Sequence, residues 1–280
     1  MSARLDSRVT AARPDLAAAH LRGKVDAEAF VDGRVAQVAR GIVGLYSAPA
    51  ADAGLQTQLL FGETFTIYEE KNHWLWGQAA WDSYVGYARA DCFVAADPVT
   101  HHVTSMATPL LVAPDVKKGA RDMLPMNARL AVAEPHGRFV RLTNGGYVFA
   151  PHLAPLGVFA PDWVAMAERF VGVPYLWGGK TAAGIDCSGL VQTALHAGGI
   201  ASPRDTDMME SALGAAIALD SVLRRGDLIF WKGHVGLMLD GERLLHANGF
   251  SMQVSIEMLA EVRNRTLDME GLPIRTIRRL

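Results

Sequence analysis

Cys187 has the sequence setting of a nucleophile. It follows the polar loop residues 184–186 and directly precedes residues 188–197, a helix-like run that ends at Gly198 and Gly199. A thiol becomes a good nucleophile when its pKa is lowered, and the N-terminus of a helix does this by stabilising the thiolate. We therefore expect the Cys187 sulfur at the start of a helix, with a lowered pKa. A buried structural cysteine is the alternative.

Two histidines further along the chain could complete a nucleophilic site. His234 precedes an expected strand at 235–239, and His246 closes the next expected strand at 243–246. Antiparallel pairing would bring both imidazoles to one end of the sheet. His234 could then act as the base, and His246 could accept a hydrogen bond from it and fix its tautomer. Asn248 is the competing candidate for this third position.

Four motifs surround these residues. They are Pro-Tyr-Leu-Trp-Gly-Gly at 174–179, Asp-Cys-Ser-Gly-Leu-Val at 186–191, Arg-Gly-Asp-Leu-Ile-Phe-Trp at 225–231 and Gly-His-Val-Gly at 233–236. In this order and spacing, residues 158–280 resemble the NlpC-type peptidases, papain-like enzymes that cut bacterial cell-wall peptides. The resemblance implies Cys187 as nucleophile, His234 as base and His246 as the residue that orients the base. No metal or cofactor is expected, because the chain has no closely spaced pair of zinc ligands.

The resemblance also implies a substrate cleft. It assigns the Tyr175 hydroxyl, together with the Cys187 main-chain N–H, to stabilisation of the oxyanion. The segment 203–206 is similar to an Arg-Asp-Ser/Thr element found in the branch that acts on free muropeptides. There an acidic side chain could pair with the free amino group of an N-terminal L-Ala. The expected substrate-contacting residues are Asp205, Thr206, Ser188, Trp177 and Tyr84. Asp186 is expected to cap the helix instead.

The rest of the chain predicts small β-domains. Residues 41–98 show short strands with aromatic alternation and turns, and 99–157 repeat this order of features more weakly. Both resemble bacterial SH3-like domains, and Tyr84 in the first is expected to close one end of the cleft. Residues 1–40 are expected to be a helical or extended segment. In 158–280, helices come first and antiparallel strands later, so the fold class is α+β, with two SH3-like β-barrels before a papain-like domain.

Composition limits the function classes. The chain has 280 residues, a formal net charge of −2 and a pI near 6.5, so it lacks the basic character of a nucleic-acid-binding protein. Its two cysteines cannot form a disulfide framework. The N-terminal residues lack the apolar core of a secretory signal, and no stretch approaches the roughly 20 apolar residues of a membrane span. A cytoplasmic location and no membrane partner are expected.

The implied reaction is hydrolysis of the bond between γ-D-glutamate and the following diamino acid in a free muropeptide with an unblocked N-terminal L-Ala. Two alternatives stay open. The same triad could serve an amidase or acyltransferase on another substrate, or the chain could be a wall-binding protein with a degenerate third domain. The sequence does not distinguish diaminopimelate from lysine at the third position and does not predict an oligomeric state.

Overall fold

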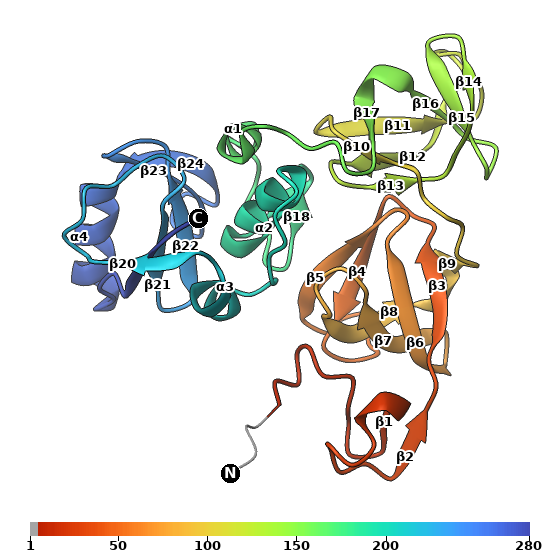
Figure 1. Cartoon of the computed structure of the whole chain (residues 1–280), viewed down its shortest axis with the longest axis horizontal. Coiled ribbons are helices and arrows are strands. Elements are labelled where there is room, and N and C mark those ends of the chain that lie inside the picture. The colour runs from red at the N-terminus through yellow and green to blue at the C-terminus, as the bar shows by residue number, and fades with distance from the viewer. Residues whose placement is uncertain (1–4) are drawn as a thin grey trace. The chain divides into compact units, whose positions relative to one another are not determined.

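The computed structural model describes residues 5–280. The chain divides into two compact units, one ending at Leu156 and the other spanning Gly157–Leu280. Figure 1 shows that the first unit is built almost wholly from strands, whereas the second combines helices with strands. The second unit starts one residue before the predicted boundary at 158.

The first unit contains a seven-stranded antiparallel sheet with the strand order β5-β4-β8-β7-β6-β3-β9. Its strands are β3 (Arg34–Val38), β4 (Ile42–Tyr46), β5 (Leu55–Leu60), β6 (Thr64–Lys71), β7 (Trp74–Ala79), β8 (Val85–Arg89) and β9 (Phe93–Val94). Apolar residues that alternate along these strands, such as Phe65 and Ile67, enclose a single core. Strand β3 pairs with β6 and β9, so this sheet starts before the predicted boundary at residue 41.

The second half of this unit repeats the strand order. One sheet has the order β12-β11-β16-β15-β14, which corresponds to β5-β4-β8-β7-β6 of the first half. A smaller sheet has the order β13-β10-β17, which corresponds to β6-β3-β9. The counterpart of β6 is therefore divided into two strands, β13 and β14. The strands are β10 (His101–Val103), β11 (Ala107–Leu111), β12 (Ala120–Pro125), β13 (Arg129–Leu130), β14 (Val132–His136), β15 (Phe139–Leu142), β16 (Tyr147–Phe149) and β17 (Leu153–Pro155). A short 3-10 helix precedes the last strand in each half, namely η2 (Ala90–Cys92) and η3 (Ala150–His152). The repeated topology agrees with a duplication, while the assignment of the second half as an SH3-like domain stays a prediction.

The N-terminal segment is mostly extended. A parallel pair, β1 (Leu16–Ala18) and β2 (Ala29–Val31), flanks the short helix η1 (Ala19–Leu21). Ala11, Ala18 and Leu21 pack with Trp76 of β7 in a small apolar cluster. This segment is therefore attached to the first barrel through an aromatic side chain of the barrel itself.

In the second unit, α1, α2 and α3 precede the six-stranded sheet, as the sequence predicts, whereas α4 comes between its last two strands in the chain. The helices are α1 (Trp163–Glu168), α2 (Cys187–Ala197), α3 (Thr206–Ala212) and α4 (Leu259–Glu270). The six-stranded sheet has the order β20-β25-β21-β22-β23-β24, with the strands β20 (Ala215–Ile217), β21 (Leu228–Trp231), β22 (His234–Met238), β23 (Arg243–Asn248), β24 (Gln253–Met258) and β25 (Thr276–Arg279). A two-stranded ribbon, β18 (Lys180–Thr181) and β19 (Gly184–Ile185), comes just before α2.

Helices contact both faces of this sheet. Val262 of α4 packs with Trp231, Met238 and Leu244. Helix α2 contacts β22 and β23 as well, and all of its side chains are buried. Because side chains alternate along a strand, β22 and β23 contribute residues to both interfaces. None of the described helices is long and apolar enough to cross a membrane.

Candidate active site

Cys187 is the first residue of helix α2, as expected. Asp186 is the N-cap residue, and its Oδ1 accepts a hydrogen bond from the Gly189 N–H at 2.7 Å. Its Oδ2 accepts another from the Gly178 N–H at 2.8 Å. Asp186 therefore caps the helix and also fixes the preceding loop, which agrees with the structural role predicted for it.

A buried arginine holds this cap in place. Both terminal nitrogens of Arg204 contact the Asp186 carboxylate, at 3.0 and 2.7 Å, and the Arg204 side chain is 1% exposed. Arg204 also donates to the Ser188 hydroxyl at 2.7 Å and to the Gly179 carbonyl at 3.3 Å. Paired geometry of this kind compensates a buried charge. Arg204 thus ties the loop after α2 to the helix start that carries the nucleophile.

The Cys187 thiol lies in a buried but polar environment. The residue is 6% exposed, and its sulfur lies 3.8 Å from the Thr206 hydroxyl oxygen. The main-chain N–H of Val235, the residue after His234, lies close enough to the thiol to favour its ionised form. Burial, followed by the negative charge of Asp186, raises the pKa of Cys187 to about 11. The expected lowering of this pKa is therefore wrong for the unliganded protein, because desolvation outweighs the effect of the helix N-terminus.

The two predicted histidines are in direct contact. His234 Nε2 lies 2.8 Å from His246 Nδ1, and the two imidazoles meet edge to face. This leaves His234 Nδ1 as the nitrogen that can serve the thiol. The described contacts include no direct hydrogen bond between Cys187 and His234. Such contacts often tighten only when substrate is bound.

His246 is 1% exposed and connects His234 to an acidic residue. His246 Nε2 lies 2.9 Å from Glu257 Oε1, and Arg265 of α4 donates to Glu257 Oε2 at 2.7 Å. Asn248 contacts His246 Nε2 at 3.2 Å, and none of its described hydrogen bonds is to His234. The structure therefore places His246, and not Asn248, beside the candidate base.

Charge and burial set the protonation of these groups in a consistent way. Burial, with the cationic forms of His246 and Arg265 nearby, lowers the pKa of His234 to about 3. Hydrogen bonds from His246 and Arg265 lower the pKa of Glu257 well below its usual range. At neutral pH the arrangement is a neutral thiol, a neutral base and an ionised carboxylate.

At two positions of the motifs, Gly189 and Gly236, a side chain would clash with neighbouring atoms of the site. A Cβ atom on Gly189 would lie 2.2 Å from the Gly179 carbonyl oxygen, so a side chain there would push the 176–179 loop away from α2. A Cβ atom on Gly236 would lie 2.8 Å from Leu244 Cδ1 and 3.2 Å from His246 Cβ. Glycine therefore lets the loop approach the nucleophile and lets β22 approach His246.

Tyr175 lies near the nucleophile. Its N–H donates to the Met252 carbonyl at 2.9 Å, and its segment bridges to Ile185, two residues before Cys187. Burial and the negative charges that Cys187 and Asp186 can carry raise the pKa of its hydroxyl. The hydroxyl is therefore a proton donor at any physiological pH, as a contributor to an oxyanion hole must be.

The predicted substrate-contacting residues are distributed unevenly. Thr206 is beside the thiol, and Asp205 is the half-buried N-cap residue of α3 next to it. The Ser188 hydroxyl is engaged by Asp186 and Arg204. Trp177 is 66% exposed in the loop before α2. Their contacts with substrate stay predictions.

Tyr84 belongs to the other compact unit. It is 3% exposed and lies in the core of the first barrel with Leu45 and Ala88. Its predicted role at the cleft stays a prediction. Cys92, also in this unit, is a free and partly buried thiol at the edge of the same core, and burial raises its pKa.

A cavity of about 370 Å³ borders the two histidines within the second unit. It is lined by His234 and His246 and by residues of the adjoining loops and α4, among them Lys232, Phe250 and Arg265. The Arg265 guanidinium also stacks over the Phe250 ring at 4.2 Å. The histidine pair therefore has an open space on the side of α4.

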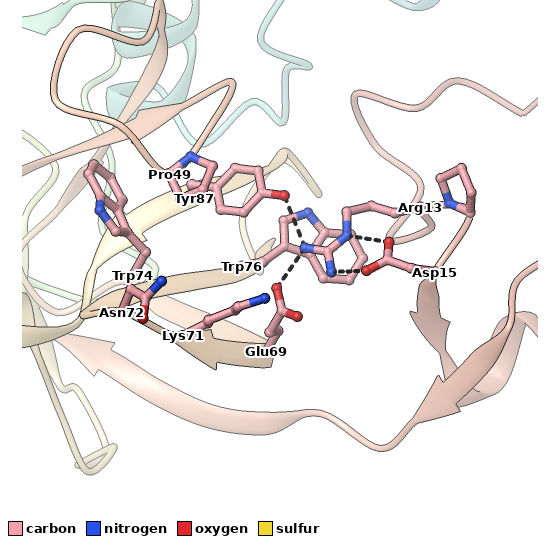
Figure 2. A pocket seen from close by; sticks show the side chains of 10 residues that line it. Arg13, Asp15, Pro49, Glu69, Lys71, Asn72, Trp74, Trp76 and Tyr87 are labelled. Carbon is pink, nitrogen blue, oxygen red and sulfur yellow. Dashed lines mark hydrogen bonds and ion pairs between the residues drawn. The ribbon is translucent and has the colours of Figure 1, made fainter.

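The first unit has a separate pocket of about 570 Å³. Figure 2 shows Arg13 at its centre, where the guanidinium lies 4.4 Å from the Trp76 ring and donates to Glu69 and Tyr87 on one side and Asp15 on the other. These contacts attach the N-terminal segment to the barrel. Among the described residues that line this pocket, no cysteine or serine is paired with a histidine.

Comparison with known proteins identifies the domains. Residues 172–267 match the NlpC/P60 family, and residues 45–91 match the bacterial dipeptidyl-peptidase SH3 domain. The chain thus carries an NlpC/P60 domain, which contains the site described above, and a bacterial SH3 domain before it. The first SH3-like domain and the NlpC-type domain expected from the sequence are confirmed.

Similar proteins cover most of the chain. It is 28% identical over 245 residues to dipeptidyl-peptidase 6 of Lysinibacillus sphaericus, covering 79% of this chain and 90% of that protein. It is 28% identical over 237 residues to the γ-D-glutamyl-L-lysine dipeptidyl-peptidase of Bacillus subtilis, covering 75% of this chain and 78% of that protein. An NlpC/P60 family protein from Bacillus cereus shares the fold, with a TM-score of 0.74 at 20% identity over 88% of this chain and 99% of that one. These relatives support a cysteine peptidase with a papain-like fold.

Three residues of the site are not predicted from the sequence, namely Arg204, Glu257 and Arg265. Arg204 lies within the segment 203–206, where the expected contact with substrate falls on its neighbour Asp205. Glu257 faces the site because β23 pairs with β24 in a register that sets Leu244 opposite Glu257 and His246 opposite Ser255. The sequence signal that could have indicated Glu257 is the alternation of polar residues across that hairpin. Arg265 has no such signal, because the helix that carries it is not predicted from the sequence.

Proposed function

We propose that this protein is a cysteine endopeptidase that hydrolyses the bond between γ-D-glutamate and the L-diamino acid of free muropeptides. The observation that carries the proposal is the position of Cys187 at the start of α2, its sulfur close to the main-chain N–H of the residue after His234, with His234 in hydrogen-bonding contact with His246. The NlpC/P60 match and the dipeptidyl-peptidase activities for which the relatives are named support this substrate class.

The residues suggest the following steps. His234 Nδ1 takes the proton from the Cys187 thiol as the sulfur attacks the γ-carbonyl carbon of D-glutamate. The Tyr175 hydroxyl and the Cys187 N–H donate hydrogen bonds to the resulting oxyanion. The intermediate expels the amino group of the diamino acid, which takes the proton from His234, and leaves a thioester on Cys187. Water, deprotonated by His234, then cleaves the thioester and releases L-Ala-D-Glu.

Recognition of the free end is proposed for Asp205. It lies at the start of α3, next to Thr206, whose hydroxyl approaches the nucleophile. A carboxylate there could pair with the ammonium group of an N-terminal L-Ala. We place the enzyme in the cytoplasm, where it would act on imported wall peptides, and a role for Tyr84 in closing the cleft belongs to the same proposal.

The decisive test is incubation of the protein with L-Ala-γ-D-Glu-diaminopimelate, the lysine analogue and the N-acetylated form of each. We expect release of L-Ala-D-Glu from the free-amine peptides alone and no release by Cys187→Ala. Equal cleavage of the acetylated peptides would refute recognition of the amino terminus. Failure to cleave any of them, with cleavage of other amides, would favour the alternative of an amidase or acyltransferase on another substrate.

Asp205→Asn gives a sharper test of the end recognition. The KM for the free-amine peptides should rise about tenfold or more, since a hydrogen bond to a charged group contributes about 1.5–3 kcal/mol. The kcat should change much less, because Asp205 contacts the substrate away from the scissile bond. An unchanged KM would remove Asp205 from the proposal, and Asp207→Asn, an exposed acid two residues away, is the matched control.

A further inference from the structure

A chain of four side chains leads from the candidate base to the protein surface. His234 Nε2 meets His246 Nδ1 at 2.8 Å, His246 Nε2 meets Glu257 Oε1 at 2.9 Å, and Glu257 Oε2 accepts from Arg265 at 2.7 Å. The members come from β22, β23, β24 and α4. His246 is 1% exposed, while the Glu257 and Arg265 side chains are 18% and 20% exposed. We call these four side chains the relay. His246 in its middle is shielded from water, and Glu257 and Arg265 at its outer end are partly exposed.

The direction of each hydrogen bond in the relay follows from its last acceptor. An ionised carboxylate can only accept, so the proton between His246 and Glu257 belongs to His246 Nε2. Neutral His246 then has a bare Nδ1, which accepts from the Nε2–H of His234. Neutral His234 in turn has a bare Nδ1, the nitrogen that must take the thiol proton. The carboxylate therefore selects the tautomers of both rings.

Neighbouring groups strengthen this assignment. Asn248 Oδ1 accepts from the N–H and the hydroxyl of Ser251, at 2.8 and 3.0 Å, which turns the Asn248 amino group inward. That group donates to the Ser255 hydroxyl at 2.8 Å, and Ser255 donates to Glu257 Oε1 at 2.9 Å. The Asn248 amino group also donates to Glu257 Oε1 at 3.4 Å, so this oxygen receives hydrogen bonds from His246, Ser255 and Asn248, which favours its ionised form.

We propose that Glu257, ionised by Arg265, is a positioning residue that fixes the tautomer of His246 and, through it, the proton-accepting state of His234. The inference rests on the proposed function for its catalytic meaning, but the tautomers themselves exist without substrate. Arg265 has the opposite electrostatic effect on His234, because its positive charge disfavours the imidazolium. Besides these four groups, the charged group lining the adjoining cavity is Lys232, and the thiol of Cys187 and the carboxylate of Asp186 lie on the side of α2.

Substitutions of Glu257 and of Arg265 should therefore shift the pKa of His234 in opposite directions. Glu257→Gln removes the anion, so His234 becomes harder to protonate and a weaker base. Arg265→Gln removes the cation while Glu257 stays, so His234 becomes easier to protonate. Damage to the fold would lower activity in both variants and would not produce shifts of opposite sign.

The experiment follows ring-nitrogen NMR of the uniformly 15N-labelled full chain, and kcat/KM for L-Ala-γ-D-Glu-diaminopimelate, from about pH 2 to pH 9, a range that includes the pKa of about 3 of His234. In the wild type we expect Nε2–H tautomers of both His234 and His246. In Glu257→Gln we expect protonation of His234 at lower pH, with kcat/KM reduced at least about a hundredfold, the lower end of what a positioned general base contributes. In Arg265→Gln we expect protonation at higher pH and an acid limb of kcat/KM displaced upward. Glu261→Gln, an exposed acid on α4, should match the wild type.

Separate outcomes test the two proposals. An Nδ1–H tautomer of His246 in the wild type, or shifts of the same sign in both variants, would overturn the role of Glu257. The expected NMR shifts in a protein that cleaves no muropeptide would instead leave the relay in place and refute the proposed function.

Discussion

At the scale of single residues, the nucleophile and its base are both neutral near pH 7. Burial raises the pKa of Cys187 to about 11 and lowers the pKa of His234 to about 3. A preformed thiolate and imidazolium pair is therefore absent from the unliganded state, and proton transfer must accompany attack on the substrate.

Alkylation kinetics should reveal this neutral thiol. With a pKa near 11, Cys187 should react with iodoacetamide at pH 7 about 10⁴-fold more slowly than when fully ionised, and the rate should rise steeply through the alkaline range. Labelling followed by peptide mass spectrometry measures the rate, in Cys92→Ser to remove the other free thiol. An inflection below about pH 8 would show that the thiolate is preformed and that the helix N-terminus prevails over burial.

Arg204 should matter for stability as well as for the site. Its removal in Arg204→Met leaves the Asp186 carboxylate buried without its cation, and breaking a buried pair in this way costs about 3–5 kcal/mol. Urea unfolding measures the loss. The control is Arg243→Gln, which breaks an exposed pair with Asp240 and should cost no more than about 1 kcal/mol. Similar losses in both variants would contradict a special role for Arg204.

At the scale of elements, close approach between the 176–179 loop and α2 shapes the site. Tyr175 and Trp177 lie in or next to this loop, and Asp186 fixes it to the helix start. A Cβ atom on Gly189 would meet the Gly179 carbonyl oxygen of this loop, and a Cβ atom on Gly179 would meet the Gly184 carbonyl oxygen. The oxyanion contacts proposed for Tyr175 depend on that approach.

Gly189→Ala should displace the loop. The added methyl would lie 2.2 Å from a main-chain oxygen that cannot move independently, so the loop must shift and kcat should fall at least about tenfold. Gly241→Ala, where the nearest atom is at 3.6 Å, should leave kcat unchanged. Equal activity of the two variants would show that the loop position is not needed for catalysis.

Elements were predicted best where local signals were strong. Helix α2 and the strands β22 and β23 each start and end within two residues of the predicted bounds. Helix α4 escaped prediction because it has a weakly apolar sequence and no side-chain N-cap. Its packing on the sheet depends on Val262, and its contribution to the site depends on Arg265, neither of which is marked by a local pattern. Contacts between distant segments were therefore the part that sequence could not supply.

At the scale of the whole molecule, the first unit repeats one strand order and the second contains every candidate catalytic group. Duplicated topology explains why the sequence showed two similar stretches. The first sheet begins with β3, before the predicted boundary at residue 41. This strand precedes the stretch with the strongest alternation of apolar residues, and its partners β6 and β9 lie far along the chain.

Acid should destabilise the second unit through the same groups that form its relay. His234 has a pKa of about 3 when folded, against about 6.5 when unfolded, so the unfolded chain binds the proton first and stability falls as pH drops from about 6.5. The lowered pKa of Glu257 acts in the same direction below about pH 4.5. Hydrogen exchange in α2 and β21–β24 should therefore accelerate between pH 7 and 4, after correction for intrinsic rates. His234→Gln removes the contribution of His234 and should make hydrogen exchange less dependent on pH above about pH 4.5. His20→Gln, at an exposed position of the first unit, is the control and should retain the wild-type pH dependence. An equally steep dependence in His234→Gln would mean that other groups control the acid stability of this unit.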